Sequence, residues 1–238
     1  MGRTILVTGA SAGIGKAICR RLLEDGDSVV GIARDFAKTG LDHERFTPVQ
    51  IDLEAVDRLA ERLPALVADH RDVDGLVCNA GRGRFGELEQ FSYGQIRGLM
   101  DLNFTSHAFL VRSLLPQLKR TSGDVVFTGS EAALRGTRRG AVYCASKFAL
   151  RGFAQALREE CARSGVRVGI VNPGMVDTAF FDDLEFRPGP DPDNLVLPED
   201  VAAAVAMVLH ARPGTVYDEI NLSPLKRVIN FDAGKRRS

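Results

Sequence analysis

Short apolar runs alternate with longer amphipathic stretches along most of this chain. Each run has the length of a single strand and is bounded by polar or glycine-containing segments. We therefore expect strands at Thr4–Thr8, Ser28–Ala33, Phe46–Ile51, Gly75–Cys78, Asp124–Thr128, Val166–Val171 and Val216–Ile220. The stretches between them carry apolar residues on one helical face, as Ile14, Ala17, Ile18 and Leu22 illustrate.

These stretches predict helices that connect parallel strands. The expected helices are Gly13–Glu24, Glu54–His70, a long helix within Phe91–Arg120, Val142–Arg163 and Pro198–His210. Pro64 should kink or break the second of them. Continuously apolar strands that alternate with helices indicate an α/β fold with a parallel sheet covered on both faces. Right-handed crossovers and a glycine-rich turn after the first strand favour a doubly wound order, 3-2-1-4-5-6-7.

The domain organisation follows from the same pattern. We find no linker and no internal repeat, so residues 1–238 are expected to form a single domain. The regular pattern lapses between Phe180 and Pro198, where aromatic, acidic and proline residues mix. A loop this long inside a compact domain is more often functional than not, so residues 179–197 predict a substrate lid with a short helix at its start.

Composition narrows the functional classes. The 31 basic and 31 acidic residues cancel, which argues against a nucleic acid or a membrane surface as partner. No apolar run approaches the ~20 residues of a membrane span. The first strand begins so early that no signal peptide fits before it, and the four cysteines lack metal-site spacing, so we expect reduced thiols in a cytoplasmic protein. The four histidines are scattered, which predicts no metal site.

Tyr143 and Lys147 form the most informative pair in the sequence. They are four residues apart in a predicted helix and therefore lie on one face, one turn from each other. A phenol has a pKa of about 10, and a neighbouring ammonium group lowers it towards the range of general acid–base catalysis. Ser130 lies thirteen residues before Tyr143, just past an apolar strand.

A glycine-rich turn follows the first strand and opens a helix. It reads Thr8-Gly9-Ala10-Ser11-Ala12-Gly13-Ile14-Gly15. Glycines permit a tight turn and let backbone amides approach a pyrophosphate, which the helix N-terminus also stabilises. The spacing Gly-x3-Gly-x-Gly differs from the commoner Gly-x-Gly-x-x-Gly dinucleotide pattern.

Taken together, these segments resemble the short-chain dehydrogenase/reductase family over essentially the whole chain. The resemblance rests on Thr8-Gly9-x3-Gly13-x-Gly15, Asn79-Ala80-Gly81, Asn103, Ser130, Tyr143-x-x-x-Lys147 and Pro173-Gly174, in this order. It implies a Rossmann-like fold and hydride transfer between a nicotinamide cofactor and a carbonyl or alcohol.

The resemblance also implies a catalytic role for four residues. Tyr143 would be the general acid and base, and Lys147 would lower its pKa and bind the nicotinamide ribose. Ser130 would polarise the substrate carbonyl. Asn103, placed in the middle of a helix where asparagine is unfavourable, would bend that helix and hold a proton-relay water.

The cofactor contacts implied by the resemblance are spread over all the strand ends. They are Gly9, Ser11, Ala12, Gly13, Ile14, Gly15, Arg34, Asp52, Leu53, Asn79, Ala80, Gly81, Tyr143, Lys147, Pro173, Gly174, Val176 and Thr178.

Cofactor preference should be decided at the end of the second strand. Family members that prefer NAD carry an acidic residue there. If Ala33 occupies that position, Arg34 can pair with a 2′-phosphate, which favours NADP(H). In the competing alignment Asp35 accepts the ribose hydroxyls and NAD(H) is favoured. We expect NADP(H), although Ala12 stands where NADP-preferring relatives often have a basic residue.

The sequence thus predicts an NADP(H)-dependent carbonyl reductase or alcohol dehydrogenase. The alternatives are an NAD(H)-dependent member and a non-catalytic dinucleotide sensor on the same fold. The loops expected to bind the substrate contain both arginines and phenylalanines. The sequence therefore leaves open whether the substrate is anionic or the pocket is partly apolar. The helix that carries Tyr143 has a small-residue stripe (Ala145, Ala149, Gly152, Ala156) and a second apolar stripe (Leu150, Ala154, Leu157, Cys161). One stripe would pack on the sheet and the other would form a homodimer or homotetramer contact.

Overall fold

A seven-stranded parallel sheet forms the centre of the computed structural model, which describes residues 2–37 and 39–231. Its strand order is β3-β2-β1-β4-β5-β6-β8, and every neighbouring pair is parallel. The strands are β1 (Thr4–Thr8), β2 (Ser28–Ala33), β3 (Phe46–Gln50), β4 (Gly75–Cys78), β5 (Asp124–Thr128), β6 (Arg167–Pro173) and β8 (Glu219–Leu222). This confirms the predicted doubly wound, Rossmann-like architecture.

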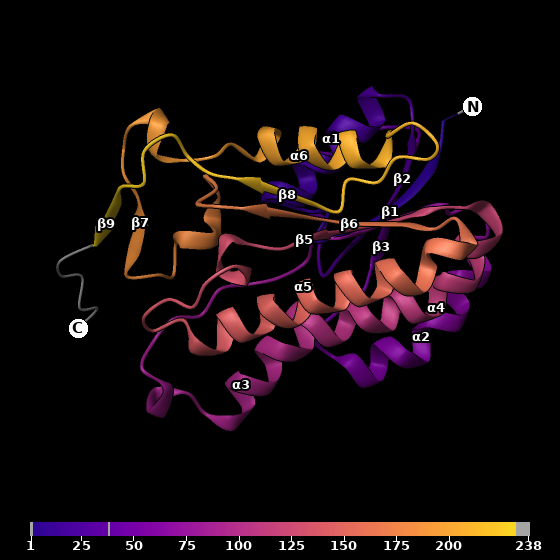
Figure 1. The fold of residues 1–238 in the computed structure, drawn as a ribbon. Coiled ribbons are helices and arrows are strands. Elements are labelled where there is room, and N and C mark those ends of the chain that lie inside the picture. Colours follow the sequence, from indigo (N-terminus) through magenta and orange to yellow (C-terminus); the bar gives the residue numbers. More distant parts are fainter. Residues whose placement is uncertain (1, 38, 232–238) are drawn as a thin grey trace.

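Helices cover both faces of the sheet (Figure 1). They are α1 (Gly13–Glu24), α2 (Val56–Asp69), α3 (Tyr93–Met100), α4 (Ser106–Thr121), α5 (Ala141–Cys161) and α6 (Pro198–Leu209). α1 and α6 pack on one face, and α2, α4 and α5 pack on the other. Because both faces are buried, the central strands are apolar on both sides, which explains their continuous hydrophobic runs.

Two predicted helices differ in detail from the expectation. α2 continues through Pro64 without a break. Pro64 has no N–H group, so the Ala60 carbonyl lacks its usual hydrogen-bond donor within the helix. Both residues are exposed, so water can donate to that carbonyl instead. The long helix predicted within Phe91–Arg120 is present but divided, because a π-helical segment, Asp101–Thr105, joins α3 to α4.

The C-terminal part contains the main corrections. The last sheet strand is Glu219–Leu222, displaced from the predicted Val216–Ile220, because the ladder with β6 begins at Ile170 opposite Glu219. The expected irregular excursion does begin with a short helix, the 3₁₀ turn Ala179–Phe181. It also contains a strand, β7 (Phe186–Pro188), which pairs antiparallel with β9 (Ile229–Phe231) beyond the ends of β5 and β6 (Figure 1).

Candidate active site

The glycine-rich turn after β1 has the backbone geometry that its sequence predicts. Gly9 and Gly13 have φ angles of +70° and +51°, a region that favours glycine. A Cβ atom on Gly15 would overlap the carbonyl oxygen of Gly9, so the first turn of α1 lies directly against the loop. The remaining predicted loop residues, Ser11, Ala12 and Ile14, belong to the same turn.

Thr8 joins this turn to the end of β4. Its hydroxyl accepts the backbone amides of Asn79 at 2.9 Å and Ala80 at 3.0 Å, and the Asn79 side chain donates to the Thr8 carbonyl at 3.0 Å. The Asn79-Ala80-Gly81 turn therefore lies beside the glycine turn.

The N-terminus of α1 suits an anionic group. Its N-cap residue, Ala12, makes no side-chain hydrogen bond to the first turn, so the amides there are not capped by a side chain. Opposite it lies the loop after β6, since a Cβ on Gly13 would meet the Thr178 methyl group at 3.2 Å. These features fit the pyrophosphate of a dinucleotide.

The loop after β6 carries the other predicted contacts on that side. Gly174, directly after Pro173, donates its amide to the Leu222 carbonyl at 2.8 Å. Val176 is buried and forms a parallel bridge with Val196. The loop is therefore anchored on both sides of the predicted contact residues.

The ends of β2 and β3 carry the residues expected near the adenosine. Arg34 is exposed and makes no ion pair with any residue that the structure describes. The carboxylate of Asp35 accepts the Ala37 amide at 2.8 Å and so stabilises its own turn. Asp52 accepts the Glu54 amide at 3.1 Å, while Leu53 is buried.

Tyr143 lies at the start of α5 and is almost completely buried, with 6% of its surface exposed. Burial raises the pKa of its phenol to about 12; a hydrogen bond with the Ser130 side chain opposes this rise, and the charges of Cys144 and Glu131 add to it. The hydroxyl of Ser130 also accepts the Ala132 amide at 3.2 Å, so this serine caps a short 3₁₀ helix as well.

Lys147 is buried one turn after Tyr143. Its ammonium group lies 6.0 Å from the centre of the Tyr143 ring and donates to the Thr128 carbonyl at 3.1 Å. Burial lowers the pKa of Lys147 to about 8. The pKa of Tyr143 therefore moves in the opposite direction to the sequence-based prediction, because loss of solvent dominates and the Lys147 ammonium group is directed towards β5.

Asn103 is fully buried in the π-helical segment, and both the oxygen and the nitrogen of its side-chain amide form hydrogen bonds. Its oxygen accepts the Arg82 amide at 3.0 Å, and its nitrogen donates to the Arg82 carbonyl and the Ser146 hydroxyl, both at 3.0 Å. A Cβ on Gly81 would lie 3.1 Å from the Asn103 oxygen and 3.7 Å from the Lys147 nitrogen. The structure thus brings the turn after β4, the π-helical segment and α5 together.

Two residues near this cluster were not predicted. Asn172 is buried at the end of β6 and accepts the Ser130 amide at 3.3 Å. His107 is buried on α4, and its Nε2 donates to the Ala80 carbonyl at 2.8 Å. Burial lowers the pKa of His107 to about 4, against the effect of that hydrogen bond, and the charge of Lys147 lowers it further. His107 is therefore neutral at pH 7 and holds the turn after β4.

Residues 3–187 match the family model for short chain dehydrogenases. The chain belongs to the short chain dehydrogenase family. This membership makes it an oxidoreductase by family.

Curated relatives of this short chain dehydrogenase include three that cover different shares of it. Sepiapterin reductase of Chlorobaculum tepidum is 30% identical over 98% of the chain and 100% of its own length. An uncharacterized oxidoreductase of Staphylococcus epidermidis is 30% identical over 77% of the chain and 82% of its own length. Estradiol 17-beta-dehydrogenase 1 of Rattus norvegicus is 37% identical over 78% of the chain, but the match spans only 57% of that relative.

Solved structures of other dehydrogenases have a similar fold. An alcohol dehydrogenase from Thermococcus sibiricus, complexed with 5-hydroxy-NADP, has a TM-score of 0.83 at 26% identity and covers 96% of this chain and 99% of its own. A short chain dehydrogenase from Burkholderia cenocepacia J2315 in complex with NADP has a TM-score of 0.80 at 26% identity, with 94% and 97% covered. Within the described ranges, no helix combines the length and apolarity needed to cross a membrane.

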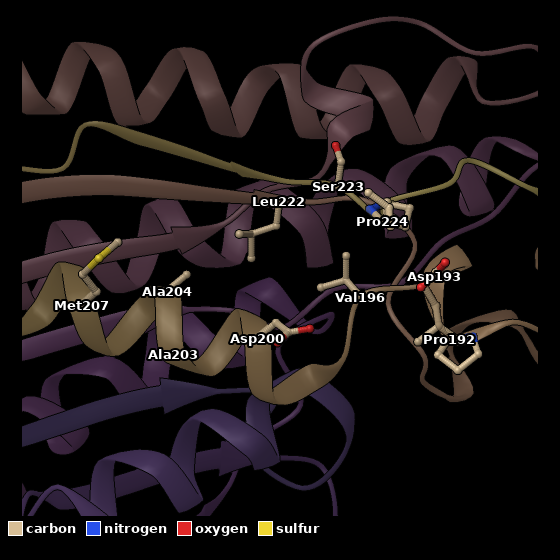
Figure 2. A pocket seen from close by; sticks show the side chains of 12 residues that line it. Pro192, Asp193, Val196, Asp200, Ala203, Ala204, Met207, Leu222, Ser223 and Pro224 are labelled. Atoms are coloured by element: carbon tan, nitrogen blue, oxygen red, sulfur yellow. The ribbon is translucent and has the colours of Figure 1, made fainter.

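A cavity of about 560 Å³ lies on the α6 side of the short chain dehydrogenase (Figure 2). It is bounded by α6, the end of β8 and the segment around Val196. Its two carboxylates already have partners, because Asp193 pairs with Lys226 at 2.8 Å and Asp200 accepts the Leu197 amide at 2.9 Å. The catalytic candidates are not among its lining residues, so the cavity is separate from the Tyr143 cluster.

Proposed function

We propose that this short chain dehydrogenase interconverts a carbonyl compound and the corresponding alcohol with NADP(H), using Tyr143 as general acid and base. The observation that carries the proposal is the buried Tyr143 phenol, with the Ser130 side chain beside it and Lys147 one helical turn away. Relatives named as dehydrogenases and as a reductase support this chemistry in either direction.

The bound cofactor would supply a hydride to the carbonyl carbon, or accept one in the reverse direction. Ser130 would donate a hydrogen bond to the carbonyl oxygen and stabilise the negative charge that develops on it. Tyr143 would pass its proton to that oxygen, giving the alcohol. With a pKa of about 12 the phenol holds its proton at neutral pH, which suits the direction of reduction.

Lys147 and Asn103 would support the proton transfer. With a pKa of about 8, Lys147 is mostly charged at neutral pH and would bind the nicotinamide ribose. Once the ribose draws the ammonium group towards Tyr143, its charge would favour the phenolate needed for oxidation. Asn103 would hold the turn after β4 against α5 through its bonds to Arg82 and Ser146, and position a proton-relay water.

NADP(H) is proposed as the preferred cofactor. Its pyrophosphate would lie on the uncapped N-terminus of α1, against the turn of Gly9, Ser11, Ala12, Gly13, Ile14 and Gly15. Asp52 and Leu53 would contact the adenine, and Asn79, Ala80 and Gly81 the adenosine side. Pro173, Gly174, Val176 and Thr178 would contact the carboxamide and the diphosphate. Arg34 would receive the 2′-phosphate, which its exposed position supports, whereas Asp35 is already engaged by the Ala37 amide. Solved relatives in complex with NADP or a derivative add support. NAD(H), bound through Asp35, is the competing choice.

A single domain with a movable lid and a homo-oligomeric assembly complete the proposal. The lid would comprise residues 179–197, which β9 contacts through its pairing with β7.

On α5 the stripe Leu150, Ala154, Leu157 and Cys161 is buried, whereas the small-residue stripe through Ala145, Gly152 and Ala156 is largely exposed. An apolar groove of about 520 Å³ between α4 and α5 lies beside it. These features support a subunit contact through α4 and α5 in a homodimer or homotetramer.

The Tyr143→Phe variant tests the proposed function. It keeps the ring but removes the proton that is transferred, so turnover should fall by about 10²–10⁴-fold while cofactor affinity stays nearly unchanged. Turnover is measured with NADPH and a panel of ketones and aldehydes, and cofactor binding by titration. Tyr93→Phe is the matched control, because Tyr93 is 93% exposed and distant in sequence from the site.

Activity of Tyr143→Phe within a few-fold of the wild type would rule out the assigned role. A wild type that binds NADP(H) but turns over no carbonyl or alcohol would instead favour the non-catalytic dinucleotide sensor.

A further inference from the structure

Two phenylalanine rings cover the phenol of Tyr143. The Phe85 ring centre lies 5.1 Å from that of Tyr143, and the Phe180 ring centre lies 5.9 Å from it on a different loop. Both separations fall in the range of favourable aromatic pairs. Phe180 also fills the space beside Gly83, where any Cβ atom would overlap its ring. The loops after β4 and β6 therefore meet above Tyr143 through aromatic contacts.

The aromatic contacts continue from this point to the surface. Phe186 on β7 lies 4.9 Å from Phe85 and 5.9 Å from Phe181, and Phe181 lies 5.2 Å from Phe180. Phe231 on β9 lies 6.4 Å from Phe186 and is 73% exposed. We call Phe85, Phe180, Phe181, Phe186 and Phe231 the aromatic cluster. It leads from the catalytic phenol to solvent and combines three segments that are far apart in sequence.

Two arginines on the loops around this cluster, Arg82 and Arg139, already form ion pairs with glutamates. Arg82 makes a two-pronged ion pair with Glu54, with distances of 2.7 and 2.8 Å. Arg139 pairs with Glu87 at 3.1 Å and with Glu185 at 3.3 Å. A carboxylate or phosphate that binds Arg82 or Arg139 would have to displace these partners, so the pairs disfavour an anionic substrate at these two arginines.

We infer that the site takes carbonyl substrates, and the corresponding alcohols, in which the reacting carbon carries an aromatic or similarly flat apolar group. The inference rests on the proposed function. The carbonyl oxygen meets Tyr143 and Ser130, and the flat group packs between Phe85 and Phe180 in place of part of the contact that each ring makes with Tyr143. Displacement of β7 admits it, because the ladder between β7 and β9 is only three residues long.

A set of methyl ketones with the same reacting group tests this substrate class. Acetophenone and 2-acetylnaphthalene carry flat rings, cyclohexyl methyl ketone has a ring of similar size without π-electrons, and 4-acetylbenzoate adds a negative charge. With NADPH, kcat/KM should be about threefold to tenfold higher for acetophenone than for cyclohexyl methyl ketone, since one or two aromatic contacts are gained. It should rise again for 2-acetylnaphthalene and fall at least tenfold for 4-acetylbenzoate.

Variants locate this preference in the cluster. Phe85→Leu and Phe180→Leu keep an apolar side chain but lose the ring, so each should reduce the ratio of kcat/KM for acetophenone over cyclohexyl methyl ketone by about threefold or more. Phe46→Leu is the matched control. It removes a ring that packs on Phe36 and lies on the edge strand β3, which β2, β1 and β4 separate from β5, and it should leave the ratio unchanged.

The possible failures can be told apart. Efficient turnover of cyclohexyl methyl ketone or 4-acetylbenzoate, equal to or above that of acetophenone, overturns the inference and leaves the proposed function intact. Ratios unchanged in both Phe85→Leu and Phe180→Leu also overturn it. If no ketone or alcohol in the set is converted with NADP(H) or NAD(H), the proposed function itself fails.

Discussion

The proposed preference for NADP(H) rests on two adjacent side chains at the end of β2. The backbone brings both Arg34 and Asp35 to the carboxyl end of the strand, next to the glycine turn. Asp35 accepts a backbone amide of its own turn, whereas Arg34 extends from the surface. A charged side chain that is engaged locally is less available for a ligand than one that is not, which favours Arg34 as the contact.

The Arg34→Ala variant should weaken NADP(H) binding and leave NAD(H) binding nearly unchanged. Charge-assisted hydrogen bonds to a 2′-phosphate are worth about 1.5–3 kcal/mol, which corresponds to about tenfold to a hundredfold in affinity. Added salt should shrink the difference. Titration of both cofactors against the wild type and the variant measures it.

Asp35→Asn is the reciprocal variant for this experiment. If Asp35 binds the ribose, its loss should weaken NAD(H), and the wild type should bind NAD(H) more tightly than NADP(H). Equal weakening of both cofactors by Arg34→Ala would also contradict the assignment of Arg34.

The positions of site residues were predictable where short sequence spacing determines them. The position of Lys147 follows from helical periodicity, and Ser130 was found through its offset from Tyr143 and the family pattern. Asn172 and His107 were missed because their contacts join positions 42 and 27 residues apart. The raised pKa of Tyr143 was missed for a related reason, since it depends on burial by rings from distant loops.

At the scale of elements, a polar network ties β6 and β8 to α5 beside Ser130. Asn172 accepts the Ser130 amide and donates to the Glu219 carboxylate at 3.0 Å. Glu219 in turn accepts from Arg151 at 2.9 Å, on the helix that also carries Tyr143. A Cβ on Gly129 would overlap the Asn172 side chain, so the chain before Ser130 lies against this network. Asn172 therefore acts as a positioning residue for Ser130.

Asn172→Ala should lower kcat by about fivefold to thirtyfold, the equivalent of one or two lost hydrogen bonds. The loss arises because the Ser130 loop is no longer held at the distance that the substrate oxygen requires. The affinity for the cofactor should change by less than about twofold. Steady-state kinetics and cofactor titration separate the two effects.

Asn221→Ala is the matched control for this network. Asn221 accepts from the same Asn172 amide at 3.0 Å but is itself exposed. The positioning role is refuted if Asn172→Ala retains wild-type kcat, or if Asn221→Ala lowers kcat by the same amount.

Elements were predictable from the sequence where a long periodic pattern is buried. β1, β2, β4 and β5 have the predicted bounds, because each is an apolar run between polar turns. The short pair formed by β7 and β9 has no such pattern, since each strand has three residues and its partner lies some forty residues away in sequence. The polar residues Glu219 and Asn221 concealed β8, because they serve the network and not the core.

Across the whole molecule, the two ends of the parallel strands have different tasks. The carboxyl ends carry the glycine turn, Ser130 and the loops of the aromatic cluster. At the amino ends, buried Asp124 at the start of β5 lies between two arginines, with Arg3 at 2.7 Å and Arg167 at 2.7 and 2.8 Å. The strand order follows from right-handed crossovers between parallel strands, so the sequence predicted it. The sequence did not predict the ionic cluster at the amino ends.

Asp124→Asn should destabilise the protein without altering the site. The variant leaves two arginines facing a neutral amide, and we expect a loss of about 2–4 kcal/mol in the free energy of unfolding. For a chain of this length the melting temperature should fall by about 5–15 °C. The kcat of the folded protein should stay within about twofold of the wild type, measured well below the melting temperature.

Asp218→Asn provides the comparison, because it changes the same residue type beside an arginine at the surface. Asp218 pairs with Arg158 at 3.0 Å, but its side chain is 70% exposed, so solvent screens the pair and its loss should cost less than about 1 kcal/mol. Equal melting temperatures for the two variants would show that the buried cluster contributes no more than a surface pair. A loss of kcat in Asp124→Asn comparable to that in Tyr143→Phe would show that the ends of β5 are mechanically coupled. Since four strand residues and Gly129 separate Asp124 from Ser130, and Asn172 holds Ser130 independently, we expect stability and turnover to respond separately.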